Sequence, residues 1–417
     1  MNSRRFLVFA PQDSRNMAAE LGRADYSYRF VLEYYRPMLA RLGSVLDLSD
    51  PLEEPASLPG VRDVRLLFLP PHQIPLDIAE RAIPVFAWEY TTIPTEPFGD
   101  DRRNDWREVL SRVPGAITHS QFAVDAVRLA MRHDFPVVDL PAPVWDRFAP
   151  LSRASRITEL TVTAAVLDSQ VAGLDRGPNR PMPDSSPRQH NLSFRGPVFT
   201  TVVNPHDGRK VWADTITAFV WALRNDPNAT LVIKLVHHDR DLALAAAWDF
   251  MRRLAPYRCR VVAIHGFLAD DEFSDLIRAT SFIVNSSRGE GQCLPLMEFM
   301  SAGVPAIAPA HTAMADYVDQ DNAFVVNSWA EWAWWPHDPR RFLRCMRHPV
   351  DWESLRKAFV AAHQIVVGDS EELASMGAAA TEAQRAHCSI EEVSAGMTSF
   401  LAVLGQREGF HPVADLD

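Results

Sequence analysis

Glycine is scarce in this sequence, with 18 glycines against 31 prolines in 417 residues. Loops that bind phosphate need glycine because their backbone must approach the anion closely, so each glycine beside a polar cluster is informative. Cysteine is scarce too, and the four cysteines form no CxxC pair. We expect buried free thiols rather than disulfides or a metal site.

Positive charge is in deficit, because 42 lysines and arginines face 53 aspartates and glutamates, which gives a net charge of −11. A nucleic-acid footprint needs an excess of positive charge, so we expect no nucleic-acid partner. The same acidity opposes general adhesion to anionic lipid but leaves a local basic patch open. With 47% apolar and 23% charged residues, the composition is that of a globular protein with a large core.

Long apolar runs are also missing. No stretch approaches the roughly 18 consecutive apolar residues of a membrane span, and the run that starts at Phe6 ends before Pro11. That run is too short for a signal peptide, so we interpret it as a first β-strand. We expect a cytoplasmic protein without a transmembrane segment, with peripheral membrane contact or a homo-oligomer left open.

Short apolar runs alternate with helical periodicity through most of the chain, a pattern typical of βαβ units and parallel sheets. In the first third we expect strands at residues 6–10, 64–69, 84–88, 115–118 and 136–140. In a second series we expect them at residues 198–203, 230–235, 260–264, 282–285 and 305–308. A helix that ends at Gly43 should be kinked at Pro37, and from Trp352 onward only helical patterns remain.

These patterns predict an α/β protein with two domains, residues 1–150 and residues 196–350. Between them, residues 151–195 have weak periodicity and a proline-rich stretch, so we expect a linker or insertion. Residues 351–417 form a C-terminal helical segment. Ligands of such sheets bind beyond the carboxyl ends of the strands, so two facing domains would form an interdomain cleft.

Residues 282–305 carry the strongest chemical signal. An apolar strand leads into a loop in which Glu290 stands between Gly289 and Gly291, and a helix follows. Glycines let the backbone approach a ligand, and the helix N-terminus favours a diphosphate. Glu298, in the first turn, can accept hydrogen bonds from vicinal hydroxyls. On chemistry alone, a helix-dipole partner and a solvated loop charge explain the two glutamates equally well.

A basic pair, Arg209 and Lys210, follows Gly208 at the start of another expected helix. Positive charge at a helix N-terminus opposes the helix dipole unless an anion lies there. Preorganised cations can stabilise a leaving diphosphate. A solvated basic pair is the alternative interpretation of this segment by itself.

The run EGQCLPLMEFMSAGVPAIA, which begins at Glu290, resembles the E-x7-E signature of retaining GT-B glycosyltransferases, the large group 1 superfamily. The family pattern has the form EGFGLPxLEAMAxGxPVIA. The resemblance implies the GT-B fold: two Rossmann-like domains that face each other across a deep cleft, with C-terminal helices crossing back to the N-terminal domain. It covers residues 198–326 well and residues 6–143 only by pattern.

The resemblance also implies roles for the motif residues. Glu290 would contact the donor sugar and Glu298 would bind the ribose of the nucleotide. Lys210 matches the family's lysine, whereas the family's arginine position is Pro205 here, so Arg209 is expected to substitute. The donor would also be held by the loop residues Gly289, Gly291, Gln292, Cys293 and Leu294, with Cys293 at the family's usual glycine position.

The segment HGFLADDEFSDLIRATSFIV resembles another stretch of the same family. By that resemblance, Gly266, Phe267 and Leu268 would line the base pocket through backbone contacts. A plain strand–turn–helix, with Leu268 and Phe273 in the core, explains the same side chains equally well.

In the first domain, many relatives carry a histidine where this chain has Glu89 and Tyr90 at a strand end. Glu89 is the candidate for orienting the acceptor, with a structural carboxylate as the alternative. Ser120 is expected to cap a helix rather than to act in catalysis. The cluster Trp329–Trp335 lies in a segment that we interpret as helical, and we expect it to pack in the core or at a domain interface.

Two short polar patterns are interpreted as turns. Residues 319–321 formally match the DxD metal motif of a different glycosyltransferase fold, and residues 237–239 read His-His-Asp. We predict no metal and no cofactor beyond the nucleotide diphosphate sugar as co-substrate. Glycine-rich dinucleotide and P-loop motifs are missing from the sequence, which disfavours redox and ATPase functions.

The expected function is transfer of a sugar, with retention and without metal, from a nucleotide diphosphate sugar to a saccharide, glycan or lipid-linked saccharide. One alternative is a GT-B enzyme that does not transfer, such as a nucleotide-sugar epimerase. The other is a catalytically inactive sugar- or nucleotide-binding partner subunit.

Overall fold

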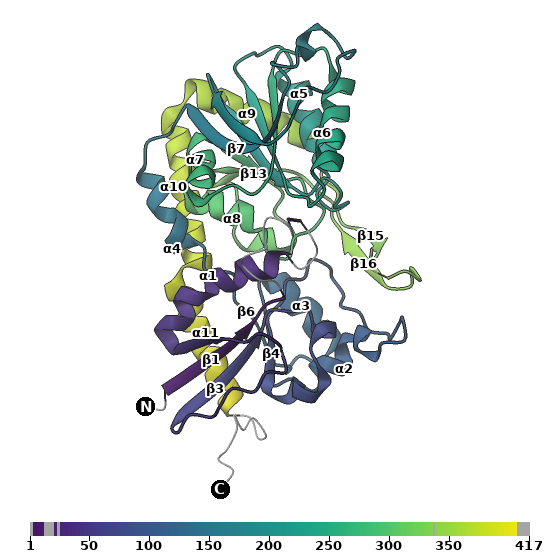
Figure 1. Cartoon of the computed structure of the whole chain (residues 1–417), viewed down its shortest axis with the longest axis vertical. Helices are drawn as coiled ribbons and strands as arrows, with labels where there is room; N and C mark the ends of the chain where they lie inside the picture. Colours follow the sequence, from purple (N-terminus) through teal and green to yellow (C-terminus); the bar gives the residue numbers. More distant parts are fainter. Residues whose placement is uncertain (1–2, 12–20, 23–25, 337, 407–417) are drawn as a thin grey trace.

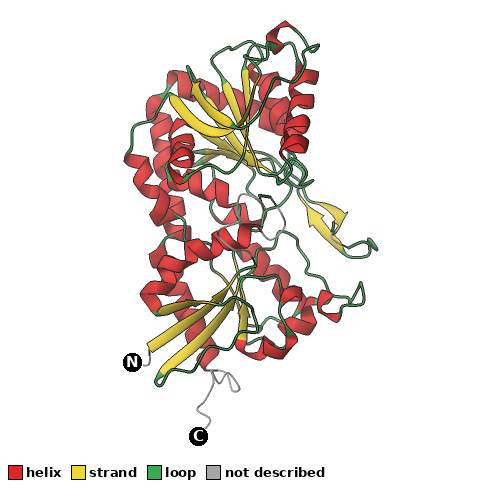
Figure 2. Cartoon of the chain, in the orientation of Figure 1, coloured by secondary structure: helices red, strands yellow, loops and turns green. Residues whose placement is uncertain are grey.

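The computed structural model describes residues 3–11, 21–22, 26–336 and 338–406. Two α/β halves stack along the long axis of the molecule (Figure 1), and helices cover the sheets of both halves (Figure 2). The first-half strands are β1 (Ser3–Phe9), β2 (Ser44–Asp47), β3 (Val61–Leu67), β4 (Ala82–Pro84), β5 (Ala116–Thr118) and β6 (Val137–Asp139).

The sheet of the first half is parallel throughout. Its strands follow the order β2-β1-β3-β4, and β5 pairs with β6 in the same sense. A parallel bridge between Val85 and Ile117 joins the two groups. Every carboxyl end therefore faces the same edge of the sheet, where Glu89 follows β4.

The second half contains an eight-stranded sheet of order β14-β13-β12-β9-β10-β11-β7-β8. The six strands from β14 to β11 are parallel, and β7 and β8 continue the sheet antiparallel. The strands are β7 (Glu159–Asp168), β8 (Arg188–Ser193), β9 (Val198–Val203), β10 (Thr230–Leu235), β11 (Arg260–His265), β12 (Phe282–Val284), β13 (Ala306–Ala308) and β14 (Ala323–Val325).

The segment expected as a linker or insertion, residues 151–195, contributes β7 and β8 to this sheet. In the first part of β7 buried residues (Leu160, Val162 and Ala164) alternate with exposed ones, and residues 164–168 are all buried. This alternation is the signature of a half-buried strand. We missed it because the outward polar residues interrupt the apolar run.

Helices flank both sheets, and their burial follows the 3.6-residue period. They are α1 (Tyr26–Leu42), α2 (Trp106–Leu110), α3 (Gln121–Ala130), α4 (Trp145–Phe148), α5 (Trp212–Leu223), α6 (Arg240–Leu254), α7 (Asp270–Ala279), α8 (Leu294–Ser301), α9 (Trp352–Gly368), α10 (Ser370–Cys388) and α11 (Ile390–Gly405). Helix α1 continues through Pro37 as a single helix.

The three C-terminal helices tie the halves together. Helix α9 packs on α5, α10 lies along α8 and α4, and α11 reaches the first half, where it contacts α1 (Figure 1). A methyl group added at Gly115 would lie 3.0 Å from atoms of both Phe400 and Leu404. This close approach shows that α11 is part of the core of the first half.

The tryptophan cluster is not helical, so that prediction was wrong. Strand β15 (Glu331–Trp334) pairs antiparallel with β16 (Arg344–Arg347) in a hairpin that projects beside the junction of the halves (Figure 1). Trp335 is buried as expected, but Trp329, Trp332 and Trp334 are exposed. Alternation along a strand, rather than three-residue helical spacing, sets which indoles face outward.

All four cysteines are free and buried, as predicted. Across the described ranges, no helix combines the length and the apolar character that crossing a membrane requires.

Candidate active site

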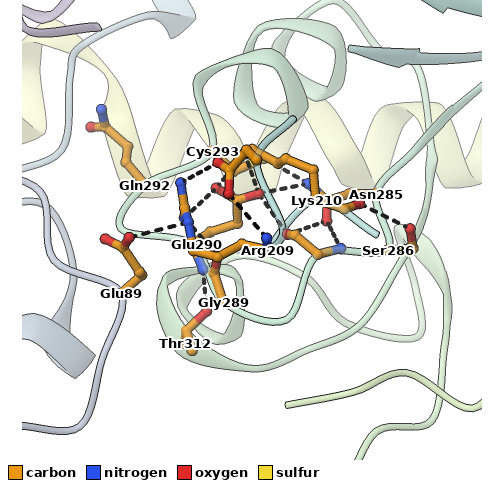
Figure 3. Close-up of polar contacts among 12 residues, drawn as sticks. Glu89, Arg209, Lys210, Asn285, Ser286, Gly289, Glu290, Gln292, Cys293 and Thr312 are labelled. Atoms are coloured by element: carbon orange, nitrogen blue, oxygen red, sulfur yellow. Dashed lines mark hydrogen bonds and ion pairs between the residues drawn. The ribbon is translucent and has the colours of Figure 1, made fainter. Parts of the chain in front are cut away.

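The candidate site lies where two strands of the second sheet end. The loop after β9 carries Arg209 and Lys210 into α5, and the loop after β12 carries Glu290 into α8. Strands β9 and β12 are parallel neighbours, so their carboxyl ends lie at the same edge of the sheet. Lys210 and Glu290, which are 80 positions apart in sequence, therefore come into contact. Figure 3 shows their side chains gathered with Glu89 of the first half.

Lys210 and Glu290 form the central ion pair. Lys210 Nζ donates to the two carboxylate oxygens of Glu290 at 2.6 and 2.9 Å. Burial alone would raise the pKa of Glu290, but the charges of Lys210 and Arg209 outweigh burial and lower it to about 2. For Lys210, burial lowers the pKa, and Glu290 more than restores it. Both groups are therefore ionised at neutral pH.

Glu290 has further donors on its own loop. Ser287 Oγ donates to Glu290 Oε1 at 2.5 Å, and Asn285 Nδ2 donates to the same oxygen at 3.2 Å. The backbone nitrogen of Glu290 donates to Thr312 Oγ1 at 3.0 Å. With 4% of its surface exposed, the carboxylate is held in one orientation by these contacts.

Arg209 connects the two halves. Its Nε lies 3.2 Å from Glu89 Oε1, its Nη1 donates to the Gly289 carbonyl at 3.0 Å, and its Nη2 donates to Asp207 at 2.8 Å. Burial opposes the charge, but Glu89 and Asp207 raise the pKa of Arg209 above its ordinary value. The guanidinium is a fixed cation between the loop of Glu290 and the first half.

The glycines of the loop allow direct contact with the first half. A methyl group added at Gly291 would lie 2.8 Å from both Ala87 Cβ and the Trp88 nitrogen, and one added at Gly289 would lie 3.0 Å from the Glu89 carbonyl oxygen. A side chain at either position would therefore push the halves apart.

The residues just before α5 and α8 have left-handed backbone conformations. Val211 has φ +38° and Cys293 has φ +67°. Cys293 stands at the family's glycine position, so this loop keeps the left-handed conformation without glycine, at a cost in strain. Asn285 Nδ2 lies 3.0 Å from the Cys293 sulfur, a contact that glycine would lack.

Gln292 and Leu294, expected at the donor, make structural contacts. Gln292 Oε1 accepts a hydrogen bond from the Ala142 nitrogen at 2.5 Å, which joins the loop to the first half. Leu294 is partly buried against the core.

Glu298 has an unexpected partner. It lies on α8, and its Oε1 accepts a hydrogen bond from the Tyr34 hydroxyl on α1 at 2.6 Å. Burial raises the pKa of Glu298 to about 7, against the opposing effect of the Tyr34 hydrogen bond. Sequence analysis missed Tyr34 because it belongs to the regular apolar face of a helix, where nothing marks one tyrosine as polar.

The segment expected to line the base pocket contains both core residues and an exposed residue. Leu268 is buried in the core and Phe273 packs against it, as the alternative interpretation predicted, while Phe267 is exposed. Gly266 has φ +137°, and its carbonyl accepts a hydrogen bond from Lys234 Nζ.

Lys234 is the second residue that sequence analysis missed. It is buried in β10, where its ammonium contacts carbonyl oxygens of Gly266 and Leu235. The signal was present, because this lysine interrupts the apolar strand TLVIKL. Burial lowers the pKa of Lys234 to about 8.

Replacing Lys234 by methionine should raise the melting temperature by about 2 to 4 °C at pH 7. The pKa of Lys234 is near 8 in the folded protein and near its ordinary value of 10.5 in the unfolded chain. Between these pH values the unfolded chain binds more protons than the folded protein, so wild-type stability increases as the pH rises from 8 to 10.5. The gain should therefore be complete below pH 8 and shrink by pH 10. Thermal unfolding at several pH values measures it, and a gain that does not change with pH would contradict the assignment.

The remaining polar patterns have structural roles. Ser120 Oγ accepts from the Ala123 nitrogen as the cap of α3, as predicted. Asp319 accepts from the nitrogens of Asp321 and Asn322 in a turn, and Asp239 caps α6. Both turn interpretations are confirmed.

Comparisons with known proteins agree with the fold and with the motif segment. The family model described as Glycosyl transferases group 1 matches residues 214–334. A search of curated protein sequences gave no match. The resemblance to the group 1 family is therefore confirmed over residues 214–334, whereas the E-x7-E assignment of Glu290 and Glu298 stays a prediction.

Solved structures of low sequence identity share the architecture. HepE from Anabaena, solved with UDP-glucose, has a TM-score of 0.57 at 11% identity over 96% of this chain and 99% of HepE. Sucrose-phosphate synthase from Thermosynechococcus elongatus has a TM-score of 0.54 at 12% identity over 97% of this chain and 99% of the synthase. The predicted GT-B fold is confirmed.

The pneumococcal O-GlcNAc transferase GtfA, solved with UDP and GlcNAc, is longer than this protein. It gives a TM-score of 0.50 at 12% identity over 93% of this chain. This chain spans 61% of GtfA.

Proposed function

We propose that this GT-B protein is a glycosyltransferase that moves a sugar from a nucleoside diphosphate sugar to a hydroxyl acceptor. The observation that carries the proposal is the buried Lys210–Glu290 pair, with Arg209 beside it, in the loops that lead into α5 and α8. Two cations in loops that lead into helix N-termini suit a diphosphate.

In this proposal the cations stabilise the leaving group. The bond between the anomeric carbon and the phosphate oxygen breaks, and a bond to the acceptor oxygen forms. Negative charge develops on the departing diphosphate, where Arg209 and Lys210 lie preorganised. The acceptor proton passes to the phosphate oxygen, so no protein acid is required.

Glu290 acts as a hydrogen-bond acceptor for the sugar hydroxyls. A pKa near 2 keeps the carboxylate ionised at neutral pH, so it has no proton to donate. Glu89, paired with Arg209 across the junction, orients the acceptor hydroxyl. Glu298 binds the ribose, and the donor reaction proceeds with retention and without metal.

The test is release of nucleoside diphosphate from sugar donors. Because HepE and GtfA were solved with UDP ligands, UDP-glucose and UDP-N-acetylglucosamine come first, followed by GDP-, ADP- and dTDP-sugars. We expect release above the rate without enzyme, with a product whose anomeric configuration, read by NMR, equals that of the donor. Release from none of these donors would refute the proposal, and an inverted product would refute retention.

A further inference from the structure

The projecting β15–β16 hairpin follows the second half in sequence, but its hydrogen bonds anchor it to the first half. The Met346 nitrogen donates to Thr91 Oγ1 at 3.1 Å, and Thr92 Oγ1 donates to the Arg344 carbonyl at 2.7 Å. Trp335 packs on Trp88, with ring centroids 5.8 Å apart. The hairpin is thus held next to Glu89, at the acceptor side of the candidate site.

The hairpin has two different faces. Ala333 and Cys345 pair on the inner face, where Cys345 is buried and feels the charge of Glu89. Trp332 and Trp334 lie on the opposite face, 58% and 40% exposed, and Arg344 pairs with Trp334 there. The exposed indoles therefore lie on the face opposite to the one that packs toward Glu89.

Two further exposed apolar side chains flank the hairpin strands, Trp329 before β15 and Phe342 before β16. Trp329 is 52% exposed and Phe342 is 68% exposed. We call Trp329, Trp332, Trp334, Phe342 and Arg344 the tryptophan face. A cluster of exposed aromatic side chains of this size is typical of an interaction surface.

The charge of this face is positive, in contrast to the net charge of −11 for the chain. Arg340 and Arg347 are neutralised by Asp338 and Glu331. Within the part of the chain that the structure describes, Arg344 makes no ion pair. Its guanidinium carbon instead lies 5.4 Å from the ring centres of both Trp332 and Trp334.

We propose that the tryptophan face docks onto the surface of a bilayer that contains anionic lipids. Tryptophan and phenylalanine place their rings at headgroup depth, and arginine is attracted to lipid phosphates. Because the hairpin projects, it reaches the bilayer while the acidic body stays away from the negative surface. A flat saccharide platform fits less well, since the planes of Trp332 and Trp334 are 88° apart and Arg344 lies over both rings.

Docking gives the proposed function an acceptor class. The hairpin contacts Thr91 and Thr92, two and three residues after Glu89, so the bound enzyme holds its acceptor side next to the membrane. The acceptor is then a lipid-linked saccharide. This assignment of the acceptor rests on the proposed function, whereas the docking does not.

Sedimentation of the full chain with vesicles tests the docking. One set contains phosphatidylcholine alone, and the other contains about one third phosphatidylglycerol. We expect binding to the anionic vesicles at low salt, and weakening as salt rises. Replacing Trp332 and Trp334 together by alanine should reduce the partition constant at least tenfold, and Arg344→Gln should reduce it about fivefold.

Trp221→Ala is the matched control, because Trp221 is 62% exposed on α5, away from the hairpin (Figure 1). It should bind vesicles like the wild type. The docking proposal would be overturned if the wild type did not bind anionic vesicles at low salt. It would also be overturned if Trp221→Ala lost as much vesicle binding as the tryptophan-face variants, or if those variants bound like the wild type. If the double variant unfolds, vesicle binding by Arg344→Gln and the salt dependence of wild-type binding test the docking instead.

Nucleoside diphosphate affinity, measured on the same variants, should stay at the wild-type value. This separates the two proposals. A wild type without nucleotide binding refutes the transferase and leaves docking intact, whereas a wild type without vesicle binding refutes docking alone.

Discussion

Lys210→Met should lower the rate of nucleoside diphosphate release at least a hundredfold. The methionine keeps the length of the side chain but removes the ammonium from the place where the leaving diphosphate develops charge, and the loss of one preorganised group of this kind has about that effect. The measurement is turnover at saturating donor, with Lys357→Met, an exposed lysine on α9, as the matched control.

The same change should also reduce stability, because it removes the closest charge partner of the buried Glu290 carboxylate. Breaking one side of a buried pair is destabilising by about 3 kcal/mol. Adding Glu290→Gln to Lys210→Met should restore most of the melting temperature without restoring turnover. If the double variant recovers activity, Lys210 serves the fold alone and the diphosphate lies elsewhere.

Glu298→Ala and Tyr34→Phe should change nucleotide affinity in opposite directions. If Glu298 binds the ribose, a ribose hydroxyl must replace the Tyr34 hydroxyl, which lies 2.6 Å from Glu298 Oε1. Removing the carboxylate should weaken nucleoside diphosphate binding at least tenfold. Removing the competing hydroxyl should tighten it about tenfold, the upper end of the net effect of one hydrogen bond.

Matched controls are available for both changes. Glu353→Ala removes an exposed glutamate of α9, and Tyr257→Phe alters a buried tyrosine outside the site. Neither should alter nucleotide affinity. Equal weakening by Glu298→Ala and Tyr34→Phe would mean that their contact supports the fold and that the ribose is bound elsewhere.

The sequence predicted the fold best where strands are continuous apolar runs. The two central strands β9 and β10 were predicted with their observed bounds, because burial on both faces makes them rich in apolar and β-branched residues, with Lys234 as the one charged exception. Strands β7 and β15 were missed because one face is exposed in the first half of β7 and along β15, and because the hairpin tryptophans imitate helical spacing.

The candidate site was predictable only within its loops. Glycine next to Glu290 and the basic pair at Lys210 are visible locally, and the structure brings these residues together with Glu89. Tyr34 was not predictable, because its contact with Glu298 spans 264 residues and depends on how the halves pack.

Calorimetric titration of nucleoside diphosphates into the full chain tests the central claim most directly, because it asks whether the loops of Lys210 and Glu290 with Glu298 bind a donor nucleotide. At least one of UDP, GDP, ADP and dTDP should bind at a single saturable site in the wild type and at least tenfold more weakly in Glu298→Ala. Binding of none of them, or binding that Glu298→Ala leaves unchanged, would contradict the account.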